Sequence, residues 1–308
     1  MCGIVGYIGH KEKTINVLLK GLGRLEYRGY DSAGIAYFED GQIKVIKKAG
    51  KLHCLEEVVD CNVLTEMGIG HTRWATHGEA NEINAHPHRY GKIVAVHNGI
   101  IENMDELKKE LECKGIKFIS DTDTEVFVAF LNDALEKYQD MKQAIEYTMA
   151  RVKGSYAIVW CNEDDLEHLY VMKKDSPLLL GVGIGEMFVA SDYQAFREFT
   201  SQYVLLDDFE YGIIGKNAWH VYKDGKEVEK KIEVLDEQDI LSNKEGYDCY
   251  MHKEIYDIPN VLTDLFTFYE NNNMHSIPDY RRYNKIQIVA CGSAYHAGCI
   301  GKSLFAHF

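Results

Sequence analysis

The sequence has little proline and a shortage of positive charge. Four prolines occur in 308 residues, and no tract rich in proline, glycine and serine is present, which argues against long disordered linkers. Lysine and arginine number 34 against 48 aspartates and glutamates, so the net charge is −14. This charge argues against a broad nucleic-acid or anionic-membrane surface, although a small local basic pocket is compatible with it.

Long hydrophobic runs, a secretory signal and zinc-ligand spacings are also missing. No apolar stretch approaches the roughly 20 residues of a membrane span. The apolar run Ile4–Ile8 is short, contains glycine and follows no basic segment, so we expect no signal peptide. None of the eight cysteines forms a CxxC pair, and the segment His86-Pro87-His88 has no third ligand nearby. We therefore expect a reducing, cytoplasmic protein with free thiols, and no metal or other cofactor.

The hydrophobic pattern predicts one complete domain and the beginning of another. Residues 1–240 combine short apolar runs with helical patterns, which is typical of a layered α+β domain. The expected helices are 14–27, 52–59, 103–113, 123–138 and 141–151, and the expected strands include 4–8, 33–38, 43–47, 92–97 and seven short runs between 156 and 222. Residues 241–284 are polar and partly helical, as in a linker. In residues 285–308, a strand at 286–290 and a following helix predict the first unit of a truncated second domain.

Cys2 stands out by its position directly after the initiator methionine. We expect removal of Met1 before this small residue, which leaves Cys2 with a free α-amine. An α-amine has a pKa of about 7.7–8.0, so part of it is neutral near pH 7 and can take the proton of the thiol, directly or through one water. A cysteine placed there by chance is the competing interpretation. The apolar strand with Gly3 and Gly6 favours catalysis, because it can hold the terminus inside a sheet.

Two glycine-containing segments offer binding groups, each with a plainer alternative. Arg73 beside Trp74, in the loop 70–78, suits a bidentate carboxylate clamp, but a structural loop with a buried tryptophan explains it equally well. Asn98 and Gly99 follow an apolar strand and offer a side-chain and a backbone N–H, which together can form an oxyanion hole. An Asn-Gly pair is also a common turn.

Two further polar segments favour structural roles. Residues 120–125 (SDTDTE) precede a helical pattern and predict helix capping, and their spacing alone does not single out Asp123 for binding an ammonium group. In the segment 26–34, we expect Arg28 to pair with Asp31.

The turn Cys291-Gly292-Ser293 follows the expected strand of the second domain. Small residues there let backbone N–H groups approach an anion at a helix N-terminus, and a sugar phosphate is compatible with this. No nucleotide-binding motif of the type GxxxxGK[ST] or GxGxxG occurs at this turn. An ordinary strand–helix turn is the alternative.

Together these motifs resemble the class II glutamine amidotransferases. The resemblance spans essentially the whole chain and rests on residues 1–6 (MCGIVG), 24–34 (RLEYRGYDSAG), 70–78, 84–88, 97–103 and 120–125. The run 26–34 and the Cys-Gly-Ser turn favour the members that carry sugar-isomerase (SIS) domains. The resemblance implies a four-layer αββα N-terminal-nucleophile fold for residues 1–240, followed by the first βα unit of an SIS domain.

The resemblance also implies roles for individual residues. Cys2 would be the nucleophile with its α-amine as base, Asn98 and Gly99 the oxyanion hole, and Arg28 a support for the terminus. The residues implied to bind glutamine are Arg73 at its α-carboxylate, Asp123 at its α-ammonium, and Trp74, Thr76 and His77 in a loop over it. Cys291, Gly292 and Ser293 would begin the sugar-phosphate site.

The implied partners are L-glutamine and, in the complete enzyme, fructose 6-phosphate as the acceptor of ammonia. The family's remaining phosphate loops, its Schiff-base lysine and its isomerisation groups lie beyond the matched stretch, so we expect this chain to act as a glutaminase. Homo-oligomers would form through the missing SIS domains.

Two alternatives stay open. One is another class II amidotransferase, of the amidophosphoribosyltransferase or asparagine synthetase type, although no matching phosphate loop follows residue 240. The other is a non-catalytic module with the same fold, which the joint presence of Cys2, Arg73, Asn98 and Asp123 argues against.

Overall fold

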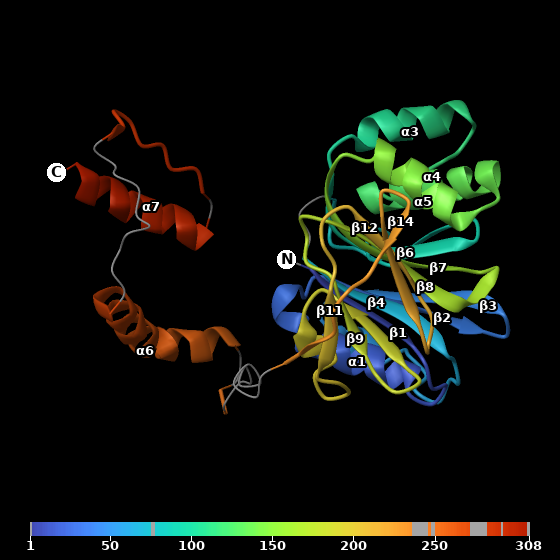
Figure 1. The fold of residues 1–308 in the computed structure, drawn as a ribbon, viewed down its shortest axis with the longest axis horizontal. Helices are drawn as coiled ribbons and strands as arrows, with labels where there is room; N and C mark the ends of the chain where they lie inside the picture. Colours follow the sequence, from blue (N-terminus) through green and yellow to red (C-terminus); the bar gives the residue numbers. More distant parts are fainter. Residues whose placement is uncertain are drawn as a thin grey trace. The chain divides into compact units, whose positions relative to one another are not determined.

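The computed structural model describes residues 2–74, 78–235, 246–247, 250–271, 282–290 and 292–306. Its contacts divide the chain into two compact units, Met1–Ser242 and Asn243–Phe308. The first unit consists of two stacked antiparallel sheets with helices on the outer face of each, so that four layers result (Figure 1). The predicted α+β class and αββα layering of this unit are confirmed.

One inner layer is an eight-stranded sheet among the described residues. Its strands are β1 (Gly3–Ile8), β2 (Ser32–Glu39), β3 (Gln42–Ala49), β4 (Met67–Arg73), β9 (Leu179–Val182), β10 (Met187–Ala190), β11 (Gln202–Leu205) and β15 (Glu233–Val234). Their order is β15-β11-β9-β10-β1-β4-β2-β3, and all neighbours are antiparallel. The strand that carries the N-terminus is therefore flanked on both sides.

The second inner layer is a seven-stranded sheet, again counted over the described residues. Its strands are β5 (His88–Tyr90), β6 (Ile93–Ile101), β7 (Gly154–Asn162), β8 (Asp165–Lys174), β12 (Glu210–Ile214), β13 (Trp219–Lys223) and β14 (Lys226–Val228). Their order is β14-β13-β12-β8-β7-β6-β5, also antiparallel throughout.

The helices form the two outer layers. Figure 1 shows α3 (Met104–Cys113), α4 (Asp123–Tyr138) and α5 (Met141–Arg151) above the seven-stranded sheet and α1 (Thr14–Arg24) beneath the other. The short helix α2 (Leu52–Glu56) shares the apolar core of α1, and two 3₁₀ turns lie at Glu26–Arg28 (η1) and Tyr193–Ala195 (η2). The bounds of α4 and α5 agree with the prediction, whereas α1 and α2 each end three residues earlier than predicted.

Side chains of β1 alternate between two apolar cores. Ile4 and Ile8 lie in the core between the sheets, while Val5 and Tyr7 pack under α1. This follows from the two-residue period of a strand, whose successive side chains point to opposite faces. A strand buried on both faces has little freedom to shift, so it fixes the position of the residue that precedes it, Cys2.

The second unit contains helices α6 (Tyr250–Asn271) and α7 (Gly292–Phe305). The helix predicted after the Cys-Gly-Ser turn is confirmed. The strand predicted at 286–290 is wrong: these residues are exposed and belong to no sheet among the described residues. A strand needs a hydrogen-bonded neighbour, and a single βα unit offers none. No helix in the described ranges is long and apolar enough to cross a membrane.

Candidate active site

Cys2 is held at the centre of the eight-stranded sheet by the residue that follows it. Gly3 opens β1 and pairs with Thr72 on β4. A Cβ on Gly3 would lie 2.6 Å from Thr72 Oγ1 and 2.7 Å from Leu25 Cβ, so only glycine fits. The chain start is therefore pressed between a neighbouring strand and the end of α1.

The Cys2 sulfur meets the end of β4. The backbone N–H of Trp74 donates to Cys2 Sγ at 3.2 Å, and the carbonyl oxygen of Trp74 lies 3.7 Å from the same sulfur. Burial raises the pKa of the Cys2 thiol, and the Trp74 backbone and the Arg73 guanidinium counteract this only in part. The thiol is thus protonated near neutral pH, and a nucleophilic role needs a base to remove the proton.

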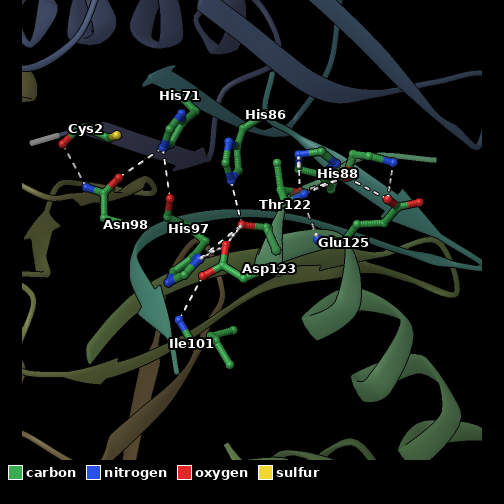
Figure 2. Close-up of polar contacts among 12 residues, drawn as sticks. Cys2, His71, His86, His88, His97, Asn98, Ile101, Thr122, Asp123 and Glu125 are labelled. Carbon is green, nitrogen blue, oxygen red and sulfur yellow. Dashed lines mark hydrogen bonds and ion pairs between the residues drawn. The ribbon is translucent and has the colours of Figure 1, made fainter. Parts of the chain in front are cut away.

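Asn98 contacts Cys2 through its side-chain amide. Figure 2 shows Asn98 between Cys2 and His71: its Nδ2 donates to the Cys2 carbonyl oxygen at 2.9 Å, and its Oδ1 lies 3.0 Å from His71 Nε2. Asn98 and Gly99 do not form a turn, and the predicted end of the strand at this pair is wrong. They lie inside β6, which continues to Ile101 because it pairs with β7 up to Gly154.

Gly99 must be glycine at this place in β6. Its φ is +131°, a conformation that L side chains rarely adopt, and an added Cβ would overlap the carbonyl oxygen of Ser155 on β7. The distorted strand brings the Gly99 backbone to the wall of a pocket that also contains Cys2.

This pocket brings together five of the predicted site residues. Of those predicted, it is lined by Cys2, Arg73, Trp74, Gly99 and Asp123. Sequence reasoning missed four lining residues, which are His86, His97, Thr122 and Thr124. Thr122 and Thr124 flank Asp123 in a segment whose capping pattern already stood out. His86 and His97 lie in segments that carry the family resemblance, but no pattern there assigned either of them to the site.

Arg73 is nearly buried, with 5% of its surface exposed. Its Nη1 donates to the carbonyl oxygen of Glu79 at 3.1 Å. Burial lowers the pKa of Arg73, while the opposite charges of Asp31 and Asp123 and the Cys2 thiol raise it. A largely desolvated guanidinium at the pocket wall is suited to bind a carboxylate.

Asp123 is the first residue of α4, and the predicted capping of this helix is confirmed. Thr122 is the N-cap and accepts from the N–H of Glu125, and Glu125 accepts from the N–H and the hydroxyl of Ser120, each at 2.6 Å. Asp123 Oδ2 accepts from the Ile101 N–H at 2.8 Å. The cap and this bond together place the carboxylate at the junction of α4 and β6.

Arg28 does not pair with Asp31, which corrects the prediction. Its Nη2 lies 2.6 Å from Asp192 Oδ2, and its Nε donates to the Tyr27 hydroxyl at 3.0 Å. The 3₁₀ turn η1 directs the guanidinium toward a residue 164 positions away, which local sequence could not indicate. Arg28 does not line the pocket.

The structure does not describe three of the other predicted site residues and places two in the second unit. Thr76, His77 and Cys291 lie outside the described residues. Gly292, with φ +60°, and Ser293 open α7 in the second unit and are exposed.

Four buried histidines, His71, His86, His88 and His97, lie close together at the pocket, and three of them contact its threonines. His86 Nε2 and His97 Nδ1 lie 2.8 and 3.1 Å from Thr124 Oγ1, and the ring centroid of His86 is 4.2 Å from that of His71 and 4.8 Å from that of His88. Burial lowers the pKa of His71 and of His88 to about 3, and that of His86 well below its ordinary value. These three are neutral at pH 7. Within the described part of the chain, no group of residues could hold a metal ion.

Comparison with known families and sequences gives consistent matches. Residues 71–198 match the glutamine amidotransferase domain family. The chain is 45% identical to glutamine–fructose-6-phosphate aminotransferase (isomerizing) of Pyrococcus horikoshii and 44% identical to that of Thermococcus kodakarensis. The alignments cover 100% and 99% of this chain but 52% and 51% of those proteins. The chain thus spans about half the length of the curated relatives it matches.

Two solved structures share the fold. One is glutamine phosphoribosylpyrophosphate amidotransferase from B. subtilis, with a TM-score of 0.63, and the other is described as the allosteric regulatory enzyme of purine biosynthesis, with a TM-score of 0.64. Each is 26% identical to this chain and matches 72% of it and 49% of its own length.

Proposed function

Because this chain carries a class II glutamine amidotransferase domain and is a homologue of the glutamine–fructose-6-phosphate aminotransferases, we propose that it hydrolyses L-glutamine to glutamate and ammonia with Cys2 as the nucleophile. The observation that carries the proposal is the pocket itself. It places the Cys2 thiol beside a desolvated cation, Arg73, and a carboxylate, Asp123, with the Gly99 backbone in the wall.

The proposed reaction uses the amine and the thiol of the same residue. The α-amine takes the thiol proton, and the sulfur attacks the side-chain amide carbon of glutamine. The carbon–nitrogen bond then breaks, and ammonia leaves with the proton held by the α-ammonium. Water hydrolyses the resulting γ-glutamyl thioester, which releases glutamate and restores the thiol. Burial of the thiol, which raises its pKa, makes the base necessary.

Charge on the attacked carbonyl oxygen needs hydrogen-bond donors. We assign Asn98 Nδ2 and the Gly99 N–H to this oxyanion hole. Asn98 Nδ2 carries two hydrogens, of which one is donated to the Cys2 carbonyl. Gly99 supports the assignment because it lines the pocket beside Cys2. A preorganised donor of this kind contributes about 10²–10³ in rate.

The charged ends of free glutamine match the two charges in the pocket. Arg73 would bind the α-carboxylate and Asp123 the α-ammonium. Trp74, Thr76 and His77 would cover the bound glutamine. Arg28 would support the site indirectly, since it ties η1 to Asp192, and the neighbouring Gly29 packs against the Arg73–Trp74 backbone.

We further propose that the longer protein delivers the ammonia to fructose 6-phosphate in the cytoplasm, as a homo-oligomer joined through SIS domains. Supporting this, the aminotransferase relatives align with essentially the whole chain, including the second unit. Residues 241–284 would be the linker, and Cys291, Gly292 and Ser293 would begin the sugar-phosphate site. The six cysteines that the structure describes are free thiols, as suits a reducing compartment.

Transfer of ammonia to a phosphoribosyl acceptor is the second candidate. It is favoured by the likeness to the B. subtilis phosphoribosylpyrophosphate amidotransferase, but that likeness extends over 72% of this chain. We prefer fructose 6-phosphate as the acceptor because the alignments with the fructose-6-phosphate aminotransferases cover 99–100% of this chain.

A glutaminase assay tests the proposal. The protein should release glutamate from L-glutamine, and Cys2→Ala should release none while it still binds glutamine in calorimetry. A variant with Met1 retained should also be inactive, because an amide nitrogen cannot act as the base. Glutamate release by Cys2→Ala at the wild-type rate would contradict the mechanism. Absence of both turnover and glutamine binding in the wild type would favour a non-catalytic module.

A further inference from the structure

His71 lies behind the proposed oxyanion hole, on β4. Its side chain is 1% exposed, and it does not line the glutamine pocket. Its Nε2 lies 3.0 Å from Asn98 Oδ1 and 3.1 Å from the carbonyl oxygen of His97 (Figure 2). Its hydrogen bonds to the site therefore go to Asn98 and to the backbone of β6, while its ring packs against that of His86, which lines the pocket.

These contacts determine the tautomer of His71. A backbone carbonyl can only accept a hydrogen bond, so His71 Nε2 must carry its hydrogen and donate. Its Nδ1 is buried and has no hydrogen-bond partner among the described residues, which is tolerable for an acceptor and costly for a second N–H. Burial lowers the pKa of His71 to about 3, so this neutral form persists throughout the working pH range.

The tautomer in turn sets the orientation of the Asn98 amide. Since His71 Nε2 donates, the Asn98 atom that faces it must be the oxygen. The nitrogen then faces the Cys2 carbonyl, where a donor is required, and the bond of 2.9 Å agrees with this. An amide rotated by 180° would set Asn98 Oδ1 against the carbonyl oxygen of Cys2 and leave the His71 N–H against an NH₂ group.

We propose that His71 is a positioning residue, which holds the Asn98 amide so that its nitrogen faces Cys2 and the developing oxyanion. This inference rests on the proposed glutaminase function. Without the His71 donor, only the Cys2 carbonyl oxygen opposes rotation of the amide, and the rotated form presents an oxygen where negative charge develops. The loss falls on the transition state, so it appears in kcat rather than in KM.

Three variants separate this role from simple core packing. His71→Leu removes the donor. His71→Gln restores it, because the glutamine amide nitrogen has two hydrogens and can reach both acceptors. His88→Leu is the matched control, since His88 is in the same buried cluster but contacts Thr122 Oγ1 instead of Asn98.

We expect His71→Leu to lower kcat for glutamine hydrolysis by about 10- to 100-fold, less than the roughly 10²–10³-fold loss of an oxyanion donor itself. KM should change little, and His71→Gln should recover most of kcat. His88→Leu should lower the melting temperature without this selective loss. In an Asn98→Ala background, His71→Leu should have no further effect on kcat. Equal kcat losses in His71→Leu and His88→Leu, or additive losses in the double variant, would overturn the proposal.

Side-chain NMR tests whether His71 orients the Asn98 amide without relying on enzyme activity. The Asn98 NH₂ resonances should be sharp and slow to exchange in the wild type and in His71→Gln, and should shift and exchange faster in His71→Leu. If the leucine variant does not fold, His71→Asn replaces it with the same expectations, since its shorter amide cannot reach both acceptors. Unchanged Asn98 resonances would refute the role of His71. A wild type without glutaminase activity would instead refute the proposed function.

Discussion

Individual residues of this site are constrained by backbone geometry as much as by chemistry. Gly3 and Gly99 show this, because each occupies a place where a Cβ would overlap a neighbouring strand. Gly3 lies beside the proposed nucleophile, Cys2, and Gly99 belongs to the proposed oxyanion hole. Close packing of β1 against β4, and of β6 against β7, therefore brings the Cys2 sulfur and the Gly99 backbone to one pocket.

Substitution of Gly99 tests this constraint. Gly99→Ala should lose both activity and stability, because it combines an unfavourable φ, which costs about 1–3 kcal/mol, with overlap on Ser155. Gly115→Ala is the control: its φ of +86° is also unfavourable, but nothing lies within 4 Å of the added Cβ. We expect Gly115→Ala to be fully active. Its free energy of unfolding, measured with denaturant, should fall by less than that of Gly99→Ala. A Gly99→Ala protein with wild-type kcat and stability would contradict the assignment.

The sequence indicated which residues line the pocket better than it indicated which residues contact one another. Cys2, Arg73, Trp74 and Gly99 came from short motifs and Asp123 from the family resemblance, and the fold brings all of them to one pocket. The histidine cluster and the Arg28–Asp192 pair escaped prediction, because they join segments distant in sequence and no periodic pattern marks them.

The N-terminus of helix α4 positions the carboxylate of Asp123. Asp123 begins α4, and the N-cap of that helix fixes where its first turn lies. The sequence indicated this element well, because polar capping residues preceded a long apolar pattern, and its bounds agree with the structure. The course of β6 was harder to predict: Asn-Gly is a turn signal, and pairing with β7 overrides it.

Two N-cap substitutions separate positioning from stability. Thr122→Ala and Asp140→Ala each remove a helix N-cap, of α4 and α5, and each should lower the free energy of unfolding by about 1 kcal/mol. Only Thr122→Ala should also raise KM for glutamine, because Asp123 follows it directly. Steady-state kinetics beside denaturant unfolding measures both effects. Equal KM values in the two variants would contradict the proposed role of Asp123 in binding glutamine.

For the whole molecule, the first unit contains the three apolar cores and every described residue of the pocket. Short apolar runs and helical patterns were sufficient to predict a layered α+β domain, whereas the αββα order of the layers came from the resemblance to the class II glutamine amidotransferases. The strand at 286–290 was not predictable in the same way, since strand formation depends on neighbours that a single βα unit does not supply. The assignment of the second unit to an SIS domain stays a prediction.

The buried histidines make overall stability depend on pH. The folded pKa of His71 and of His88 is about 3, against about 6.5 when unfolded, so the unfolded chain binds more protons between these values. The free energy of unfolding should have its full value above about pH 6.5. It should fall as the pH drops toward 3, by up to about 1.4 kcal/mol per pH unit for each histidine.

Denaturant unfolding between pH 7.5 and about 5.5, above the range where carboxylates titrate, measures this dependence. His88→Gln should flatten the slope, because it removes one of the protons taken up on unfolding. A free energy of unfolding that does not change with pH in the wild type would show that these histidines are not buried in the neutral form.

The proposed mechanism requires a covalent bond between glutamine and Cys2. Rapid mixing of the protein with L-glutamine, acid quenching and mass spectrometry of the N-terminal peptide measure that bond directly. We predict a peptide that begins at Cys2 without Met1 and carries one γ-glutamyl group, which disappears in Cys2→Ala and accumulates and decays at rates consistent with turnover. Glutamate release with no such adduct at any time, or with an adduct on another residue, would contradict Cys2 as the nucleophile.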